Sequence, residues 1–280
     1  MALKAARLAD YATNVGLPRN LVDTPVFVPS LYELSQEPGV IDLALADEMP
    51  IPPADLRELY FGDRHYEYWL SGLHDWRCIE RAANLPSGGH RFCDFGGSSG
   101  RVARHAAQAP GSDVYVADVN SETVNWLNYN ESSRVKALQT GVSPVLPFED
   151  GYLDIVSAFS VFTHIDTSEI QWIMELRRVI RRGGILYLTV HNNATWDLLH
   201  TPEWRERVKN GPNGDELTAQ LDDPAGMPDR MVATYNEADL YNCNVYISDD
   251  YIRRVWGRLF RECTITPLLH GHQSAVVLKK

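Results

Sequence analysis

The chain has 280 residues, of which 44% are hydrophobic and 22% charged. This composition is typical of a globular protein with one sizeable core and excludes a disordered chain. The formal net charge is −11, and no run of Lys or Arg exceeds two residues. The basic patch that neutralises nucleic-acid phosphates is therefore missing, and we expect no nucleic-acid partner.

Neither a membrane segment nor a secretion signal is visible in the sequence. No stretch of about 18 consecutive apolar residues exists, and the N-terminal MALKAARLAD lacks a long apolar run. We therefore expect no membrane span and a cytoplasmic location. Because the four cysteines are widely separated and form no CxxC pair, we also expect reduced thiols and no metal site. They are Cys78, Cys93, Cys243 and Cys263.

The first 84 residues precede the region of regular patterning. Seven prolines interrupt residues 1–53, which predicts an irregular arm because proline breaks helices and central strands. Residues 54–84 contain apolar and aromatic side chains at three- and four-residue spacings, which predict two helices joined near Gly72. We therefore treat residues 1–84 as an N-terminal arm and helical lid, and residues 85–280 as the core.

Strand and helix patterns alternate from about residue 90 to residue 191. Such alternation predicts an α/β fold with a doubly wound, mostly parallel sheet. The expected strands cover 91–95, 114–118, 135–140, 153–162 and 185–191. The expected helices cover 101–109, 121–130 and 168–182, and the last of these should end at Gly183-Gly184.

The remaining chain divides into an insertion and a terminal hairpin. Residues 192–245 lose the alternation and contain four prolines, so we expect an insertion after the fifth strand that covers the substrate. Residues 248–260 then read as a helix, followed by strands at 263–269 and 274–280 on either side of the turn His-Gly-His.

A glycine-rich turn, Asp94-Phe95-Gly96-Gly97-Ser98-Ser99-Gly100-Arg101, follows the first expected strand. Glycines allow the backbone to approach a ligand closely, and the N-terminus of the next helix offers free N–H groups. Such an end binds the pyrophosphate of a dinucleotide or the carboxylate of another ligand. The turn alone does not distinguish between these ligands.

Asp118 ends the second expected strand, 24 residues after Asp94. An acidic residue at roughly this distance accepts the ribose hydroxyls of a nucleoside in dinucleotide-binding folds. The alternative is a structural role, because ADVNSE is also a good helix start that Asp118 could cap.

Four ordered segments resemble the class I S-adenosylmethionine-dependent methyltransferases. They are FCDFGGSSGR, VYVADVN, PVLPFEDGYLDIVSAFSVFTHI and ELRRVIRRGGILYLTV, within about residues 90–191. The resemblance implies a Rossmann-like sheet of seven strands that ends in an antiparallel hairpin. It also implies that the cofactor is S-adenosyl-L-methionine.

The same resemblance assigns cofactor contacts to particular positions. Around the methionine part it implies Asp94, Gly96, Gly97, Ser98 and Gly100, together with Ser160 and Phe162. It implies Asp118 at the ribose and Val119, Asn120 and Val142 near the adenine.

Two of these positions depart from the family pattern. Val142 stands where the family commonly has an acidic residue, so its side chain cannot bind the adenine amine. Ser98 stands where the family usually has glycine, which a serine tolerates if its backbone angles are ordinary.

Methyl transfer to a hydroxyl benefits from a general base, and histidine supplies one most readily near neutral pH. His164 and His191 follow the fourth and fifth expected strands, at the sheet edge where ligands bind in such folds. Both are candidate bases, with structural roles as the alternative. His74, on an aromatic-rich helix, is the weaker candidate.

The acceptor is expected to be a small molecule or a glycan. The C-terminal segments DDYIRRVWGRLF and GHQSAVVLKK are similar to the ends of bacterial methyltransferases of glycan-modifying pathways. This similarity concerns the fold and the tail and not a substrate site. The oligomeric state has no signal in the sequence.

Three other functions are alternatives to the methyltransferase. An α/β hydrolase could use Ser98 in Gly-x-Ser-x-Gly as nucleophile, with Asp239 and either His270 or His272. A nicotinamide dehydrogenase would need a complete Gly-x-Gly-x-x-Gly, which the turn lacks. A non-catalytic scaffold that keeps the cofactor site fits the departures at Ser98 and Val142.

Overall fold

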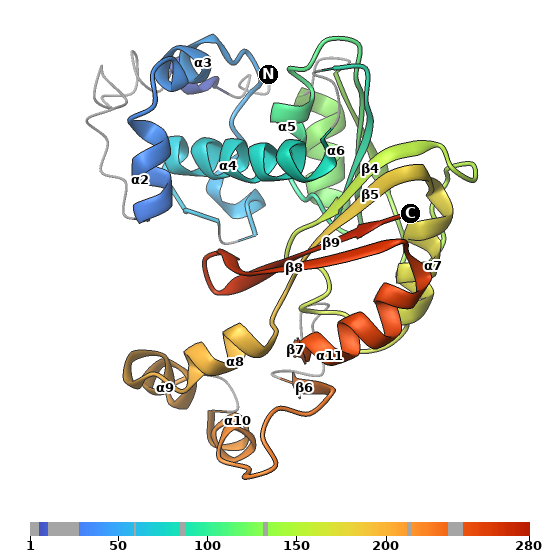
Figure 1. The fold of residues 1–280 in the computed structure, drawn as a ribbon. Helices are drawn as coiled ribbons and strands as arrows, with labels where there is room; N and C mark the ends of the chain where they lie inside the picture. The colour runs from blue at the N-terminus through green and yellow to red at the C-terminus, as the bar shows by residue number, and fades with distance from the viewer. Residues whose placement is uncertain are drawn as a thin grey trace. The chain divides into compact units, whose positions relative to one another are not determined.

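The computed structural model describes residues 6–10, 28–58, 60–84, 88–130, 134–211, 214–234 and 243–280. The chain divides into two compact units, Met1–Gly141 and Val142–Lys280. Seven strands form one sheet in the order β3-β2-β1-β4-β5-β9-β8, and β6 and β7 form a second sheet (Figure 1). The predicted doubly wound sheet of seven strands is thereby confirmed.

The first unit contains three parallel strands of the sheet. They are β1 (Arg91–Phe95), β2 (Asp113–Asp118) and β3 (Val135–Gln139), with β1 paired to β2 and β2 to β3. Most residues of β1 and β2 are buried, as in sheets covered on both faces. The helices of this part are α5 (Ala103–Ala106) and α6 (Ser121–Asn130).

The helix expected over 101–109 is much shorter than predicted, since α5 holds four residues between turns. The N-terminal arm, in contrast, is more regular than predicted. Its described part forms α2 (Pro29–Ser35), α3 (Val40–Ala46) and the 3₁₀ turn η2 (Ala54–Leu56). Pro29 lies in the first turn of α2, where proline fits because its missing N–H is not needed. Pro18 and Pro25 lie outside the described residues.

The prediction of two helices joined near Gly72 is wrong. A single helix, α4 (His65–Ala83), runs through this glycine without a break. A Cβ at Gly72 would lie 2.1 Å from the backbone oxygen of Arg101. Glycine at this position therefore permits close packing of α4 on the turn after β1 and does not end a helix.

A buried ion pair fixes the N-terminal segment to α5. Arg104 Nε donates to Asp47 Oδ2 over 2.9 Å, and Trp69 Nε1 donates to the same oxygen over 2.8 Å. Asp47 and Arg104 are 4% and 2% exposed, so removal of either partner would leave a buried charge. Residues 1–84 thus share a compact unit with β1–β3, and the division of the chain falls after Gly141. The lid function of this segment stays a prediction.

The second unit contains the other four strands of the large sheet. β4 (Leu153–Ala158) pairs in parallel with β5 (Ile180–Val190). β9 (Gln273–Lys279) pairs antiparallel with both β5 and β8 (Glu262–His270). This arrangement confirms the predicted terminal hairpin.

Two boundaries in the second unit differ from the prediction. The strand expected over 153–162 ends at Ala158, because the chain turns at Ser160 with a φ of 59°. The helix α7 (Glu169–Val179) ends earlier than expected, and Gly183-Gly184 lies inside β5. A Cβ at Gly184 would lie 2.5 Å from the backbone oxygen of Asp154, so this glycine serves close strand packing.

The segment after β5 forms a separate helical and stranded group (Figure 1). Its aromatic and aliphatic side chains, among them Trp196 and Tyr246, pack into a small core of their own. Its elements are α8 (Asn193–Leu199), α9 (Pro202–Lys209), α10 (Gly214–Leu221), β6 (Arg230–Thr234) and β7 (Cys243–Ile247). A substrate-covering function for residues 192–245 stays a prediction.

The helix expected over 248–260 is divided into three short pieces. They are α11 (Asp249–Tyr251), the π-helical η3 (Ile252–Trp256) and the 3₁₀ turn η4 (Gly257–Leu259). All four cysteines are free thiols, as predicted. Within the described ranges, no helix is both long and apolar enough to cross a membrane.

The close approach at Gly72 predicts the effect of a single methyl group. Gly72→Ala should lower the free energy of unfolding by about 2 kcal/mol, since the added Cβ overlaps backbone that cannot rotate away. Thermal unfolding measures this loss. An unchanged or higher melting temperature would contradict the packing of α4 described above.

Candidate functional site

The turn after β1 has the backbone conformation that its glycines favour. Gly96 and Gly100 have φ values of 69° and 81°, in the left-handed region. Gly97 has another reason to be glycine, because a Cβ there would lie 2.8 Å from the Cβ of Asp94. Asp94 itself is 2% exposed. The turn therefore exposes bare backbone above a buried carboxylate.

Ser98 does not have the ordinary backbone angles under which a serine would be tolerated easily. Its φ is 46°, in the left-handed region that favours glycine. Its backbone N–H donates to Asp118 Oδ2 over 2.7 Å. Its hydroxyl donates to the backbone oxygen of Leu56 over 3.5 Å, at the limit of a hydrogen bond. The strained residue thus connects the turn to the end of β2.

Asp118 is 3% exposed and accepts hydrogen bonds on both carboxylate oxygens. Its Oδ1 accepts the backbone N–H of Asn120 over 2.8 Å. Burial raises the pKa of Asp118 above its usual value, and the backbone donors at Asn120, Ser98 and Val119 partly oppose this rise. A carboxylate has about four lone-pair sites, so these bonds leave acceptor capacity for a ligand.

The alternative that Asp118 only caps the next helix is not supported. Asn120, and not Asp118, accepts the free N–H of the first turn of α6: its Oδ1 takes the N–H of Glu122 over 2.9 Å. Its backbone oxygen accepts from Val124 N over 3.2 Å. The helix start is therefore satisfied without the carboxylate.

Glu58 reaches the same place from the N-terminal segment. Its Oε1 accepts a hydrogen bond from Asn120 Nδ2 over 3.1 Å. Glu58 could not be predicted from the sequence, because nothing in the spacing of ADLRELYF connects this residue to the end of a strand 60 residues later. Only the folded chain shows that Glu58 lies beside Asn120.

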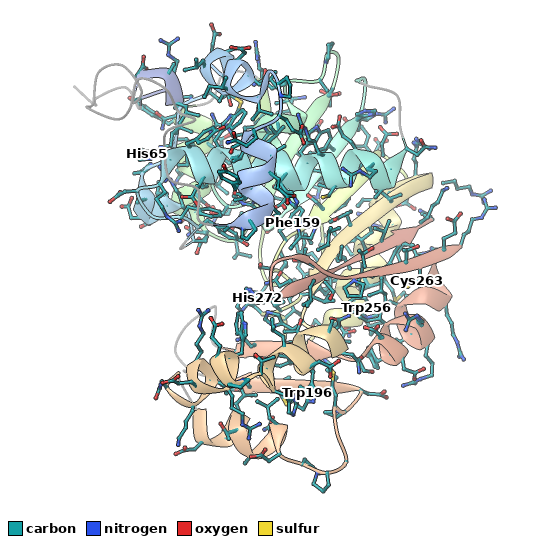
Figure 2. All side chains as sticks on the ribbon, turned by 60° about the vertical axis from the view of Figure 1, so that its left-hand side comes forward. His65, Phe159, Trp196, Trp256, Cys263 and His272 are labelled. Carbon is teal, nitrogen blue, oxygen red and sulfur yellow. The ribbon has the colours of Figure 1, made fainter. Side chains whose placement is uncertain are left out.

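A buried arginine holds the segment that bears Glu58. Arg57 is 1% exposed and donates to the backbone oxygens of Pro52 and Gly62 over 2.6 and 2.5 Å. It also donates to Nδ1 of His65, labelled in Figure 2, over 2.5 Å. Burial and this guanidinium lower the pKa of His65 to about 4, so the imidazole stays neutral at pH 7.

Tyr68 on α4 extends this support to the glycine turn. Its ring lies 4.8 Å from the guanidinium carbon of Arg57, and its hydroxyl hydrogen-bonds the hydroxyl of Ser99 over 3.1 Å. The neighbouring aromatic residues of α4 belong to the core, since Tyr66, Tyr68 and Trp69 are 1–2% exposed.

In the second unit, Ser160 and Phe162 are held by the protein. Ser160 N–H donates to Thr189 Oγ1 over 2.7 Å, and its hydroxyl bonds the side-chain amide of Gln273. Phe162 is 1% exposed and packs edge-on against Trp256 at 5.4 Å. Val142, at the start of this unit, is 71% exposed. Their contacts with a cofactor stay predictions.

His164 lies beside the insertion at the end of the turn after β4. Its Nδ1 lies 2.7 Å from the backbone oxygen of Cys243, and a carbonyl can only accept, so Nδ1 carries the proton. Val245 N–H donates to Thr163 O over 2.8 Å on the same side. The insertion strand β7 thereby fixes both the position and the tautomer of His164.

His191 is 5% exposed and packs between the rings of Tyr246 and His272, at 5.1 and 5.4 Å. Neither ring nitrogen has a hydrogen-bond partner among the residues that the structure describes. Burial, with His272 and His164 nearby, lowers the pKa of His191 to about 3. Such an imidazole is neutral but weakly basic at pH 7.

The neighbouring asparagines, Asn192 and Asn193, form hydrogen bonds within the protein. Asn192 Nδ2 donates to Asp249 Oδ1 over 2.6 Å, and its Oδ1 accepts from Ser274 Oγ over 2.6 Å. Asn193 Oδ1 accepts the backbone N–H of Asp249 over 2.8 Å. These bonds attach α11 and β9 to the end of β5.

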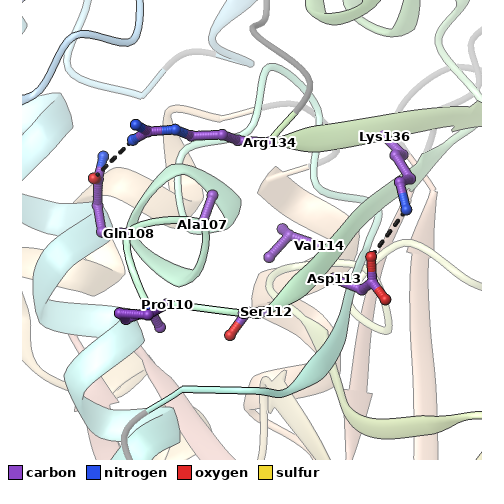
Figure 3. Close-up of a pocket in the computed structure, with 10 residues that line it drawn as sticks. Ala107, Gln108, Pro110, Ser112, Asp113, Val114, Arg134 and Lys136 are labelled. Carbon is purple, nitrogen blue, oxygen red and sulfur yellow. Dashed lines mark hydrogen bonds and ion pairs between the residues drawn. The ribbon is translucent and has the colours of Figure 1, made fainter.

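A cavity of about 510 Å³ lies elsewhere in the first unit (Figure 3). It is lined at the start of β2 and β3, where Lys136 pairs with Asp113 over 2.9 Å and Arg134 donates to Gln108 over 3.3 Å. Ligands of doubly wound sheets bind at the opposite, carboxyl ends of the strands. We therefore do not assign the cofactor to this cavity.

The residues at the carboxyl ends of β1 and β2 fit a nucleoside with an amino-acid tail. Gly96, Gly97 and Gly100 carry no side chains, so the backbone of the turn can approach a ligand closely. Asp118 and Glu58 provide acceptors for hydroxyl or amine donors. These residues fit S-adenosylmethionine, and their contacts with it stay predictions.

Residues 93–188 match the family model described as a methyltransferase domain. The search of curated proteins found no match. The match identifies residues 93–188 as a methyltransferase domain, on a sheet with the strand order of the doubly wound fold. Its cofactor is S-adenosylmethionine.

Solved structures of similar fold include a methyltransferase from Methanosarcina mazei, at 16% identity over 70% of this chain and 94% of that one, with a TM-score of 0.49. A possible histamine N-methyltransferase from Thermotoga maritima is 14% identical over 79% and 96%, with a TM-score of 0.46. The [4+2]-cyclase SpnF is 24% identical with a TM-score of 0.37, and the match covers 43% of this chain and 44% of that one.

The family match argues against two of the other functions weighed. The Gly-x-Ser-x-Gly sequence lies inside the matched methyltransferase domain, which argues against a hydrolase elbow at Ser98. Asp239, the acid proposed for a hydrolase, lies outside the described residues. The match to a methyltransferase domain also argues against a nicotinamide dehydrogenase.

The backbone strain at Ser98 predicts a stabilising substitution. Ser98→Gly keeps the N–H that bonds Asp118 and removes the steric cost of the left-handed conformation. It should raise the free energy of unfolding by about 1 kcal/mol. The matched variant Ser98→Ala keeps the strain, so its melting temperature should not rise. Equal melting temperatures for Gly and Ala variants would contradict the assigned φ.

The burial of His191 predicts an acid-dependent loss of stability. The imidazole is protonated below about pH 6.5 when unfolded, but its folded pKa is about 3. Stability from this group is therefore complete above pH 6.5 and falls between pH 6.5 and 3. His191→Phe removes the titration and both unpaired nitrogens.

The parent protein should lose about 2 kcal/mol of its free energy of unfolding between pH 8 and pH 5 through His191. His191→Phe should not show this loss, so its stability relative to the parent should be about 2 kcal/mol higher at pH 5 than at pH 8. Chemical denaturation at the two pH values measures this difference. A difference that does not depend on pH would show that His191 has the same pKa in the folded and the unfolded chain.

Proposed function

We propose that the protein transfers the methyl group of S-adenosylmethionine to a hydroxyl of a small molecule or glycan, with His164 as general base. The hydrogen bond from His164 Nδ1 to the backbone oxygen of Cys243 carries this proposal. It fixes the tautomer in which Nε2 is the basic nitrogen, and a base needs a defined acceptor atom.

His164 is the better of the two candidate bases. It is partly exposed, whereas His191 is 5% exposed and has a pKa of about 3. The most effective base has a pKa near the working pH, so the weakly basic His191 is poorly matched to neutral conditions. We assign to His191 the role of a neutral wall residue beside the acceptor.

The protein's part in the reaction is alignment and removal of a proton. The cofactor, when bound, supplies a methyl group on a positively charged sulfur. His164 would accept the hydroxyl proton at Nε2 while the oxygen–methyl bond forms, the methyl–sulfur bond breaks and S-adenosylhomocysteine leaves as a neutral thioether. The resulting imidazolium keeps its Nδ1–H bond to the Cys243 carbonyl, which becomes a stronger, charge-assisted bond.

Aromatic rings of the second unit support a ring-bearing or sugar acceptor. His272, labelled in Figure 2, is exposed and lies in the turn between β8 and β9, and its ring is 5.6 Å from that of Trp204 on α9. The backbone oxygen of His272 accepts from Thr195 Oγ1 over 2.7 Å. Because β9 runs antiparallel to β5, this turn lies at the carboxyl end of β5, on the edge where acceptors are expected.

A panel of acceptors tests the proposed reaction. The protein is incubated with methyl-labelled S-adenosylmethionine and hydroxyl-bearing small molecules, oligosaccharides, amines or thiols, and labelled product is measured. Methylation of a hydroxyl compound supports the proposal. Methylation of amines or thiols alone would contradict it, and cofactor binding without turnover on any member would favour the scaffold.

His164→Gln should lower kcat for the hydroxyl acceptor by about 100- to 10,000-fold at neutral pH, because the base is lost. The affinity for S-adenosylhomocysteine should stay unchanged. The matched control is His74→Gln, which changes the weaker candidate on α4 and should retain kcat. Equal kcat values for His164→Gln and His74→Gln would contradict the assignment of His164 as general base.

A further inference from the structure

Glu58 is a carboxylate beside the Asp118 site that neither the cofactor turn nor the proposed reaction accounts for. We propose that Glu58 is a second acidic contact for the cofactor, and that its carboxylate accepts a hydrogen bond from the adenosine part. This inference rests on the cofactor assignment and not on the acceptor or the base.

The position of Glu58 follows from two hydrogen bonds that share Asn120. The backbone N–H of Asn120 donates to Asp118 Oδ1 over 2.8 Å, and its side-chain Nδ2 donates to Glu58 Oε1 over 3.1 Å. One asparagine therefore lies between two carboxylates. A nucleoside that reaches Asp118 with its ribose also comes within reach of Glu58.

The backbone at Glu58 is strained in the way that functional residues often are. Its φ is 49°, a left-handed value that costs a residue with a Cβ about 1–3 kcal/mol. Asn or Gly would adopt this conformation more easily. A glutamate at this place is not explained by local stability, which suggests that its carboxylate serves another purpose.

The surrounding segment is rigid enough to hold Glu58 in position before a ligand arrives. Arg57, the preceding residue, is 1% exposed and bonds Pro52 and Gly62 on both sides of Glu58. Ser98 Oγ contacts the backbone oxygen of Leu56. The segment is thereby attached both to itself and to the glycine turn, and a preorganised contact costs less entropy on binding.

The adenosine part also needs more acceptors than Asp118 alone offers. It carries two ribose hydroxyls and an exocyclic amine, while both Asp118 oxygens already accept backbone N–H groups. Val142 has only an apolar side chain. Glu58, half-buried and with a second carboxylate oxygen, supplies acceptor capacity at this place.

Calorimetric titration with S-adenosylhomocysteine tests the proposal. Glu58→Gln should weaken binding about 10- to 100-fold, the usual effect of losing a hydrogen bond to a charged group. The matched control Glu122→Gln, on the exposed first turn of α6, should leave the affinity unchanged. Equal affinities of Glu58→Gln and the parent protein would overturn the proposal.

A second variant separates ligand binding from a merely structural role. Glu58→Gly relieves the strained backbone and removes the carboxylate. It should therefore melt at the same or a higher temperature without ligand, yet bind S-adenosylhomocysteine more weakly. A lower melting temperature with unchanged affinity would show that Glu58 only holds Asn120, and would refute the proposal.

Cofactor analogues identify the group that Glu58 binds. The inosine analogue of S-adenosylhomocysteine lacks the amine, and the 2′- and 3′-deoxy analogues each lack one ribose hydroxyl. The parent protein should bind the analogue that lacks the donor to Glu58 more weakly than S-adenosylhomocysteine. Glu58→Gln should bind both ligands with similar affinity, so the effects of the substitution and of the missing group should not be additive. Additive losses for all three analogues would overturn the proposal. Failure to methylate any hydroxyl would leave these binding results intact and would count against the proposed reaction alone.

Discussion

The hydrogen bond from the Ser98 backbone to the Asp118 carboxylate is the interaction on which the cofactor site depends. It joins the glycine turn after β1 to the end of β2 over 2.7 Å. Asp118 is 3% exposed, so its charge needs these backbone donors to remain stable in the interior. The same carboxylate thus orders the turn and offers acceptor sites to a nucleoside.

Close backbone contact is the second constraint, and it explains why the N-terminal segment belongs to the first unit. Gly72 lets α4 approach the backbone oxygen of Arg101, and Gly97 lets the side chain of Asp94 pack directly against the turn. The buried pair of Asp47 and Arg104 fixes the same segment on α5. Through these contacts, residues far from the matched domain bring Glu58 to the end of β2.

The sequence predicted the succession of core strands and the glycine turn after the first of them, because buried parallel strands and a glycine turn have strong local patterns. It could not reveal Glu58, whose contact with Asn120 joins positions 62 residues apart. It misread Gly72 as a helix break, since close packing and helix termination both select glycine. The role of Asp118 as a helix cap also stayed open until the structure showed Asn120 in that place.

A crystal structure of the protein with S-adenosylhomocysteine tests the central claim most directly. The account predicts ribose hydroxyls within about 2.6–3.2 Å of the Asp118 carboxylate, with the amino-acid tail along Gly96–Gly100. A nucleoside bound away from the ends of β1 and β2, with Asp118 contacting only its backbone donors, would contradict it.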